Sequence, residues 1–218
     1  MDRVRVAFVG TGGIAAAHLK GLSAMPDVEL VGFCDVVEER AREAAARYGG
    51  KAFASARAML GELQVDALFI TVPPFAHGEA EWAAIDARVP FFVEKPVGLD
   101  LGLCREIAAG VAEAGLLTCV GYMNRYRAGI RRARTLFAGD PPVFACGGWV
   151  GGVPPAPWWS QRRLSGGQFV EQTTHTADLM RYFLGEAVEV YSCPVPPRTF
   201  NTDVPEPYDI DDASMVDR

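Results

Sequence analysis

The chain has 218 residues, of which 50% are hydrophobic and 22% are charged, and its formal net charge at pH 7 is −6. This composition supports a packed core, and the acidic balance lacks the clustered basic excess that marks a nucleic-acid-binding protein. The apolar runs are far too short to span a bilayer, so we predict no membrane association.

Cysteine and histidine usage argues against a metal centre. Five cysteines stand at positions 34, 104, 119, 146 and 193, and no pair has the two-residue spacing of a zinc or redox site. With only three histidines as well, we expect no metal. Reduced cysteines and an N-terminus that enters a strand without a charged leader predict a cytoplasmic protein without a signal peptide.

The first half of the sequence alternates short apolar runs with segments of helical periodicity. The expected strands are 4–9, 28–34, 51–53, 67–72, 91–93 and 117–122, and the expected helices are 14–25, 38–48, 55–63 (capped by Ser55), 76–88 and 101–114. Strands that alternate with helices pair in parallel through crossovers. The pattern therefore predicts a Rossmann-type, doubly wound α/β domain over residues 1–122.

The second half of the sequence does not continue this alternation of strands and helices. It predicts helices over 130–138 and 169–184 and strands over 143–150, 188–191 and from 213, with Gly/Pro-rich connections at 151–163 and 194–207. The last strand has no evident partner in the pattern. We expect residues 123–218 to form an incomplete α+β domain that binds substrate and supports oligomerisation.

A glycine pattern follows the first predicted strand. Gly10-Thr11-Gly12-Gly13-Ile14-Ala15 fits G-x-G-x-x-A, the dinucleotide fingerprint, between a strand and a helix. The glycines allow a tight turn and a close approach of the pyrophosphate, which binds at the helix N-terminus. The competing interpretation is an ordinary tight turn.

An acid ends the second predicted strand. The Asp35 carboxylate can accept hydrogen bonds from the adenosine ribose hydroxyls and would repel a 2′-phosphate, so we expect NAD rather than NADP as the cofactor. A simple cap of the following helix is the alternative role for Asp35.

A lysine stands where the fifth predicted strand ends, in Glu94-Lys95-Pro96. Ligands of open α/β sheets lie beyond the carboxyl ends of the strands, where a Lys95 ammonium can stabilise charge on a substrate oxygen. Pro96 fixes the turn, and a cis bond suits such a site. An ordinary solvated loop lysine is the alternative.

These motifs together resemble the Gfo/Idh/MocA oxidoreductases, whose namesakes include glucose-fructose oxidoreductase and inositol dehydrogenase. The resemblance rests on the glycine turn, Asp35, the Thr71-Val72-Pro73-Pro74 loop with His77, Glu94-Lys95-Pro96 and SGGQFVEQTTHTADLMRYFLGE. It implies that Lys95 is catalytic and that His175 transfers the substrate proton. The expected cofactor site consists of Gly10, Thr11, Gly12, Gly13, Ile14, Ala15, Asp35, Thr71, Pro73, His77, Glu94, Lys95 and Pro96. His77, at a helix start, and His18, in the first helix, also suit structural positions.

The predicted helix over 169–184 can carry proton-transfer chemistry. Glu171 and Asp178 lie four residues before and three residues after His175, so all three can share one face. A neighbouring carboxylate orients a histidine ring and raises its basicity. Many members of the resembled family have Asp four residues before the histidine, whereas this chain has Glu171. We assign Glu171 a catalytic role beside His175, which would also contact substrate, and a satisfied helix histidine is the alternative.

Further substrate contacts are expected from Asn124 and Arg125, which follow the sixth strand, and from Trp158, with Trp159 beside it; interdomain packing is the alternative role. The resembled family has a large second-domain sheet, of which this chain contains only the start, so we expect a truncated member and a homo-oligomer for a full-length form.

The predicted function is an NAD-dependent oxidoreductase acting on a sugar, polyol or related hydroxy compound. Two alternatives share the fold: an NAD-dependent glycoside hydrolase, and a non-catalytic nucleotide-binding fragment or regulator. Retention of both Lys95 and His175 disfavours the regulator.

Overall fold

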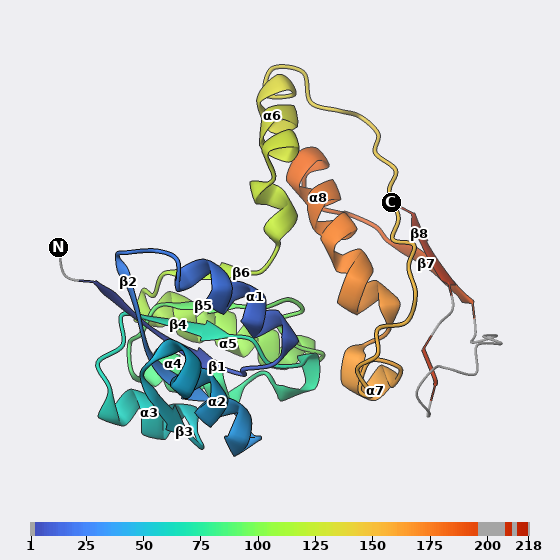
Figure 1. Ribbon diagram of the computed structural model, residues 1–218. Helices are drawn as coiled ribbons and strands as arrows, with labels where there is room; N and C mark the ends of the chain where they lie inside the picture. Colours follow the sequence, from blue (N-terminus) through green and yellow to red (C-terminus); the bar gives the residue numbers. More distant parts are fainter. Residues whose placement is uncertain (1–2, 196–207, 211–212, 218) are drawn as a thin grey trace. The chain divides into compact units, whose positions relative to one another are not determined.

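The computed structural model describes residues 3–195, 208–210 and 213–217, and the chain forms two compact units, Met1–Gly121 and Tyr122–Arg218 (Figure 1). Strands and helices alternate along the first unit. Its strands are β1 (Val4–Val9), β2 (Val28–Cys34), β3 (Lys51–Phe53), β4 (Ala67–Ile70), β5 (Phe91–Val93) and β6 (Thr118–Val120). Its helices are α1 (Gly13–Leu22), α2 (Glu38–Tyr48), α3 (Ala56–Glu62), the 3-10 turn η1 (Pro74–Ala76), α4 (Glu79–Asp86) and α5 (Leu101–Ala114).

The strands of the first unit form one parallel sheet in the order β3-β2-β1-β4-β5-β6. The chain runs outward from β1 to β3 and then returns to the other side of β1 with β4. The carboxyl ends of β1 and β4 therefore form the switch point at which ligands bind in open α/β sheets. The predicted Rossmann-type, doubly wound sheet is confirmed.

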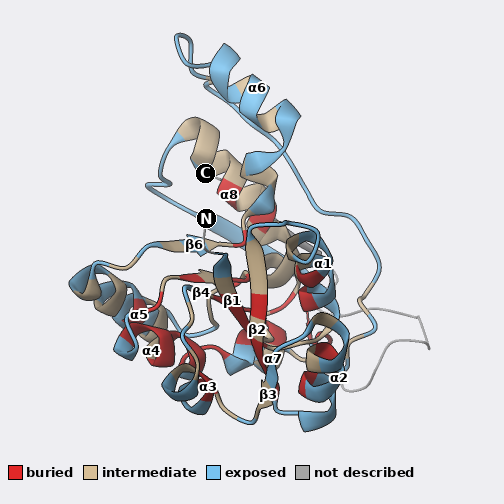
Figure 2. Ribbon diagram, turned by 60° about the vertical axis from the view of Figure 1, so that its left-hand side comes forward, coloured by how far each residue is buried: buried red, intermediate tan, exposed pale blue. Residues whose placement is uncertain are grey.

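Each face of this sheet is covered by its own set of helices. Along β1, Val6 and Phe8 pack with α1 and α2 on one face, whereas Ala7 and Val9 belong to the core under α3, α4 and α5 on the other. Figure 2 shows the buried residues concentrated in the central strands and in the helix faces turned toward them. Burial on both faces explains why the strands read as nearly continuous apolar runs.

An aromatic ladder crosses the α1/α2 face of the sheet. Phe33, Phe8, Phe69 and Phe92 stand in register on β2, β1, β4 and β5. Their ring centroids are 6.4, 5.0 and 4.9 Å apart in that order. Aromatic pairs at such spacing add stability beyond their buried area, so the ladder ties the cofactor half of the sheet to β5.

Local sequence signals set several helix ends. The Ser55 hydroxyl accepts a hydrogen bond from the Ala58 N–H at 3.1 Å, as predicted for the cap of α3. Asp100 caps α5 in the same way through the Leu103 N–H at 2.7 Å. Gly115 ends α5 with a φ of +63°, a left-handed conformation that favours glycine.

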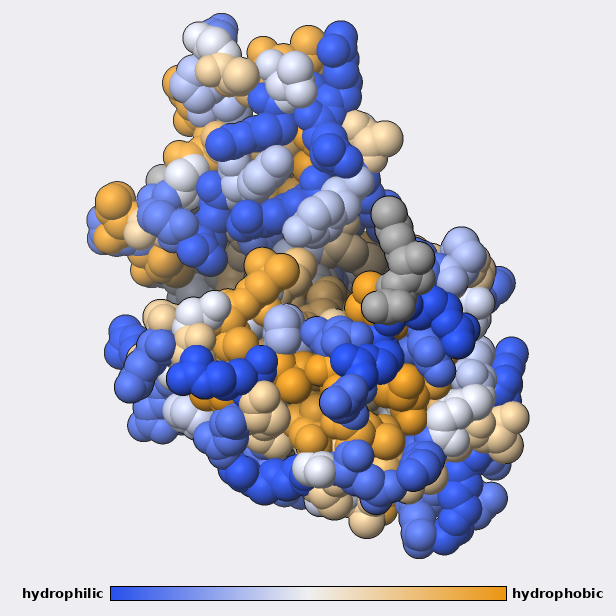
Figure 3. Space-filling model, turned by 90° about the vertical axis from the view of Figure 1, so that its left-hand side faces the viewer, coloured by the Kyte–Doolittle hydropathy of each residue, from blue (hydrophilic) through white to orange (hydrophobic). Residues whose placement is uncertain are grey.

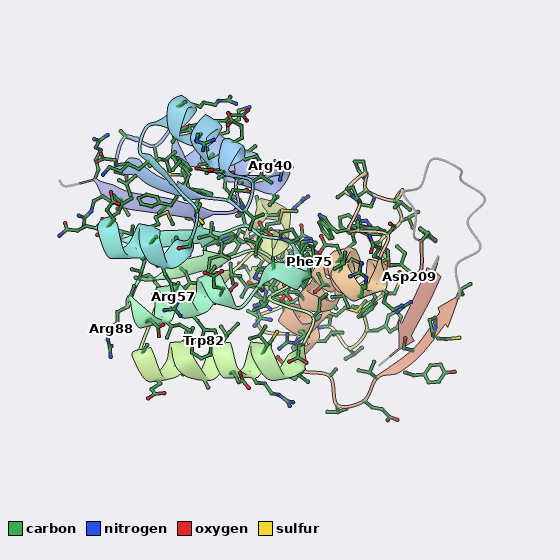
Figure 4. The ribbon with its side chains drawn as sticks, turned by 90° about the horizontal axis from the view of Figure 1, so that it is seen from below. Arg40, Arg57, Phe75, Trp82, Arg88 and Asp209 are labelled. Carbon is green, nitrogen blue, oxygen red and sulfur yellow. The ribbon has the colours of Figure 1, made fainter. Side chains whose placement is uncertain are left out.

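The helices α4 and α5 meet through Trp82 of α4, which Figure 4 labels. A Cβ added to Gly110 of α5 would lie 2.8 Å from Cζ3 of Trp82. The absent side chain at Gly110 therefore makes room for the indole ring between the two helices.

The second unit contains helices and a small sheet. Its elements are the 3-10 turn η2 (Met123–Tyr126), α6 (Ala128–Leu136), α7 (Arg162–Ser165), the π-helix η3 (Phe169–Thr173), α8 (Thr174–Leu184), β7 (Tyr191–Val195) and β8 (Ala213–Asp217). The predicted helix over 130–138 is confirmed by α6. The helix predicted over 169–184 is present, but its first turn is π rather than α.

Four predictions about this unit were wrong. Residues 143–150 form no strand, and Val143, Phe144 and Val150 are exposed, because no described strand pairs with this apolar run. The strand predicted over 188–191 begins only at Tyr191, and residues 162–165 of the predicted connection form α7. The last strand was expected to lack a partner, but β8 pairs antiparallel with β7. Most of the predicted connection 194–207 lies outside the described residues.

A distant segment caps α7. The Asp209 carboxylate accepts a hydrogen bond from the N–H of Arg162 at 2.5 Å, and the Asp209 N–H donates to the Ser160 carbonyl at 3.1 Å. Ile210 is 1% exposed and belongs to the core of this unit, whereas Asp209 is exposed.

Within the described residues, no helix is long and apolar enough to cross a bilayer. Nor does the described part of the chain gather three or more His, Cys, Asp or Glu side chains into a possible metal site. Figure 3 shows one face of the molecule, on which a patch of hydrophobic residues is surrounded by hydrophilic ones.

Candidate cofactor and catalytic site

The glycine turn joins β1 to α1 at the switch point of the sheet. Gly10 has a φ of +83°, and a Cβ there would lie 2.6 Å from the backbone oxygen of Thr71. The turn is held by the Gly10 N–H, which donates to the Cys34 carbonyl at 2.8 Å, and by the Thr71 hydroxyl, which donates to the Gly10 carbonyl at 2.6 Å. Only glycine satisfies both the dihedral and the close approach.

The start of α1 fits a dinucleotide phosphate. Gly12 is the N-cap residue, and no side chain caps the helix. A Cβ added to Gly12 or Gly13 would meet nothing within 4 Å. Amide groups at such an open helix end attract anions through hydrogen bonds and the helix dipole. The turn therefore has both the space and the donors that a pyrophosphate requires.

Asp35 ends β2 beside this turn and is 8% exposed. Its Oδ2 accepts hydrogen bonds from the Thr11 N–H at 2.8 Å and the Thr11 hydroxyl at 3.0 Å, and its Oδ1 accepts one from the Val37 N–H at 2.8 Å. Asp35 thus braces the glycine turn and the start of α2. A carboxylate has about four acceptor positions, so capacity for ribose hydroxyls remains.

The loop after β4 lies against the glycine turn through Thr71, whose side chain is buried. Pro73 and η1 follow, and His77 then pairs with Glu81 of α4 at 2.6 Å between Nδ1 and Oε1. The side chains of His77 and Glu81 are 1% and 0% exposed. Glu81 also accepts a hydrogen bond from the Gly78 N–H at 2.7 Å. This geometry gives His77 a buried contact at the start of α4 rather than a surface one.

Glu94, Lys95 and Pro96 follow β5, and the Lys95–Pro96 bond is cis, as expected. Lys95 is half-buried, whereas Glu94 is buried. The Glu94 carboxylate accepts from the Lys95 N–H at 3.1 Å and contacts His18 of α1 at 2.8 Å between Oε1 and Nε2. It also lies against Gly121, where a Cβ would be 2.7 Å from Oε2.

Within the second unit, His175 on α8 is 6% exposed. Its ring lies between Tyr122, perpendicular at 6.3 Å, and Trp149, tilted by 30° at 6.1 Å. Glu171 stands in the preceding π-helix, a form that is frequent at functional sites. These two aromatic rings contribute apolar surface around the imidazole.

Asp178 of α8 is paired with Arg125. Both of its oxygens accept hydrogen bonds from Arg125, at 2.8 Å from Nε and 2.6 Å from Nη2. Hydrogen bonding to Asp178 raises the pKa of the Arg125 guanidinium. The guanidinium also lies 5.0 Å from the Tyr182 ring centroid. Arg125 thus fixes the turn after β6 to α8, and Glu171 remains the candidate carboxylate for His175.

The other predicted substrate residues differ in exposure. Asn124 and Trp158 are half-buried, and Asn124 accepts a backbone hydrogen bond from Arg127 at 3.2 Å. Trp159 is 3% exposed and belongs to the interior of the second unit.

The sequence interpretation gave no site role to His18 or Trp149, although both contact predicted site residues. His18 stands three residues after the fingerprint alanine, on the first turns of α1. This closeness to the fingerprint was the one sequence signal that could have indicated a site role. No local pattern identified Trp149, because the contact with His175 joins a coil to a distant helix.

Comparisons with known proteins agree with this geometry. A sequence model described as an oxidoreductase family with an NAD-binding Rossmann fold matches residues 4–122, more than half of the chain. The chain therefore belongs to this oxidoreductase family, the Gfo/Idh/MocA family that its motifs resemble, and the predicted family and NAD cofactor are confirmed.

Similar proteins include several inositol dehydrogenases. The chain is 31% identical over 218 residues to scyllo-inositol 2-dehydrogenase (NAD(+)) of Bacillus subtilis, covering 97% of this chain and 62% of that protein. It is 27% identical over 191 residues to myo-inositol 2-dehydrogenase of Thermotoga maritima, covering 85% and 56%. A solved structure of a putative myo-inositol dehydrogenase from Sinorhizobium meliloti superposes with a TM-score of 0.74 at 25% identity, covering 90% and 60%. The chain thus spans about three-fifths of the length of these relatives.

Proposed function

We propose that the chain supplies the cofactor-binding and proton-transfer residues of an NAD-dependent dehydrogenase that acts on a sugar, polyol or related hydroxy compound. The observation that carries this proposal is Lys95, which lies two residues beyond the carboxyl end of β5, two strands from β1 and its open glycine turn. The similarity to inositol dehydrogenases supports the substrate class.

Each residue has a defined part in this chemistry. Bound NAD would supply the hydride acceptor, held by the glycine turn and by Asp35. The Lys95 ammonium hydrogen-bonds the substrate oxygen and stabilises negative charge that develops on it. His175, oriented by Glu171, accepts the hydroxyl proton as the carbinol carbon loses its hydride. Asn124, Arg125 and Trp158 remain candidates for substrate contact, although the bond to Asp178 already engages Arg125.

The proposed preference for NAD over NADP rests on Asp35. A 2′-phosphate would stand beside its carboxylate, and like charges in close contact repel. In the proposal, Thr71, Pro73, Glu94 and Pro96 shape the cofactor site around the turn, and His77 supports it from the buried side.

The test is turnover of NAD by the purified chain across a panel of polyols and sugars, with Lys95→Ala and the exposed control Lys51→Ala. Loss of one transition-state charge contact predicts a fall in kcat of about 100-fold or more for Lys95→Ala. NADH affinity should change little in either variant. Unchanged turnover in Lys95→Ala would overturn the assignment. A released sugar without net NADH would instead indicate glycosidic bond cleavage.

Assembly and location complete the proposal. We propose that a full-length form is a homo-oligomer in the cytoplasm and that it acts on small molecules. Analytical ultracentrifugation of that form tests the assembly, and a monomer at micromolar concentration would contradict it.

A further inference from the structure

His18 of α1 contacts β5, the strand that precedes the proposed catalytic lysine. Its ring lies 5.0 Å from Phe92 at an interplanar angle of 62° and 5.6 Å from Phe69. The imidazole thus packs against the β4 and β5 rungs of the aromatic ladder, and its side chain is 26% exposed. This packing restricts the ring and sets the direction of Nε2.

The Glu94 carboxylate contacts Nε2 of His18, and each of its two oxygens has a polar partner. Oε1 lies 2.8 Å from Nε2 of His18, and Oε2 accepts the Lys95 N–H at 3.1 Å. Gly121, at the end of β6, leaves room for the carboxylate, because a Cβ there would stand 3.0 Å from Cδ and 2.7 Å from Oε2. The side chain of Glu94 is therefore turned back onto the sheet and is only 10% exposed.

We propose that His18 is a positioning residue, which acts through Glu94 to fix the backbone at Lys95 and thereby to aim the lysine side chain. The inference rests on the proposed function, in which the Lys95 ammonium contacts the substrate oxygen. It also assigns Glu94 to the support of Lys95 rather than to direct contact with the cofactor.

The pair joins two parts of the site that the sequence keeps 76 residues apart. The helix α1 begins at the glycine turn, where the pyrophosphate would bind, and carries His18 about one and a half turns after its first residue, Gly13. Lys95 lies two residues after the end of β5. A hydrogen bond between buried or half-buried partners that are both anchored by packing holds its geometry. His18 thus sets the lysine relative to the helix that receives the cofactor.

The experiment compares three variants of the whole chain. His18→Phe keeps an aromatic ring against Phe69 and Phe92 but removes Nε2. His18→Gln restores a hydrogen-bonding group of similar reach. Lys20→Gln, on the exposed side of the same helix, is the matched control. Thermal unfolding followed by circular dichroism establishes that each variant is folded before the other measurements are made.

The first readout is steady-state turnover. Because small misplacements of catalytic groups cost large factors in rate, we expect kcat to fall about tenfold in His18→Phe. KM for NAD and the NADH dissociation constant should stay within about twofold, since a loss confined to kcat marks an interaction made in the transition state. His18→Gln should recover at least a third of the lost rate. Wild-type kcat in a folded His18→Phe variant would overturn the proposal.

The second readout does not depend on activity. The sequence has three lysines, Lys20, Lys51 and Lys95. After reductive methylation with ¹³C-formaldehyde, each gives its own NMR signal, and Lys95→Arg identifies the signal of Lys95. His18→Phe should move that signal and leave those of Lys20 and Lys51 in place, and His18→Gln should move it less.

The two readouts separate failure of the inference from failure of the proposed function. If the wild-type chain turns over no substrate but His18→Phe moves the Lys95 signal, the positioning role is supported and the proposed activity of this chain is rejected. If His18→Phe leaves the Lys95 signal unmoved, the positioning role is overturned whether or not the chain is active.

Discussion

The glycine turn offers the sharpest separation of a structural from a cofactor-binding role. Gly10 and Gly12 are two residues apart in the same motif, yet a methyl group at each would meet different surroundings. At Gly10 it would lie 2.6 Å from the oxygen and 2.8 Å from the carbon of the Thr71 backbone. At Gly12 it would find nothing within 4 Å.

These distances set the expected magnitudes. Gly10→Ala combines the cost of a left-handed alanine, about 1–2 kcal/mol, with an overpacking cost of about 1–3 kcal/mol against a main chain that yields little. We therefore expect it to lower the free energy of unfolding by roughly 2–5 kcal/mol. Gly12→Ala, with a φ of −76°, should lower it by less than about 1 kcal/mol, the usual cost of alanine at an N-cap. Its methyl group would instead fill the space proposed for the pyrophosphate.

Urea unfolding and NADH titration test both expectations on the same samples. The titration follows energy transfer from tryptophan to the nicotinamide. Gly12→Ala should weaken NADH binding by at least about tenfold, which corresponds to 1.4 kcal/mol, with the unfolding midpoint nearly unchanged. Wild-type NADH affinity in Gly12→Ala would refute the proposed pyrophosphate site at the start of α1. Wild-type stability in Gly10→Ala would refute the inferred close approach to Thr71.

Three further predictions concern charged and thiol groups. Arg125→Ala should destabilise the chain by roughly 1–3 kcal/mol, measured by urea unfolding, because it leaves the buried Asp178 carboxylate uncompensated; this figure is reduced for the partial exposure of Arg125. Hydrogen bonds from Arg5 lower the pKa of Asp66 from 3.8 to about 2. Their stabilisation is present above pH 4 and is lost as the pH falls through 2, so Asp66→Asn should flatten the dependence of Tm on pH in that window. Burial raises the pKa of the Cys34 thiol to about 11, so Cys34 should react last with iodoacetamide at pH 8.

Each of these predictions has a matched comparison. The exposed Arg127→Ala should change stability by less than about 0.5 kcal/mol, and an equal loss in both arginine variants would contradict the special role of Arg125. A Tm profile of Asp66→Asn as steep as that of the wild type would reject the Asp66 interpretation. Cys119, Cys146 and Cys193 are exposed and provide the fast-reacting reference for Cys34 in peptide mass mapping. Equal labelling of Cys34 would show that the thiol is accessible.

The sequence determined the first unit because its signals are local. Apolar runs bounded by turns, a glycine fingerprint and side-chain caps such as Ser55 each depend on residues close in the chain. The parallel sheet then follows, since alternating strands and helices have few ways to bury both sheet faces. The same locality made the glycine turn, Asp35 and Lys95 identifiable as candidate site residues.

Only the tertiary structure decided the features that depend on contacts between residues far apart in the sequence. Residues 143–150 have the composition of a strand, but a strand exists only where another strand supplies hydrogen bonds, and no described segment does so there. Asp178 pairs through both of its oxygens with Arg125, which lies 53 residues away in the sequence, and no local pattern identifies that partner. The cap of α7 comes from Asp209, 47 residues later.

His18 illustrates the same limit within the candidate site. Its position in the motif marks it as a residue of the first helix, and nothing nearby in the sequence identifies Glu94 as its partner. Only the packing of α1 across β4 and β5 brings the imidazole to the carboxylate that contacts Lys95. Local sequence patterns therefore identify the candidate side chains of this chain. Which of them contact one another depends on the register of the sheet and on how the helices pack against it.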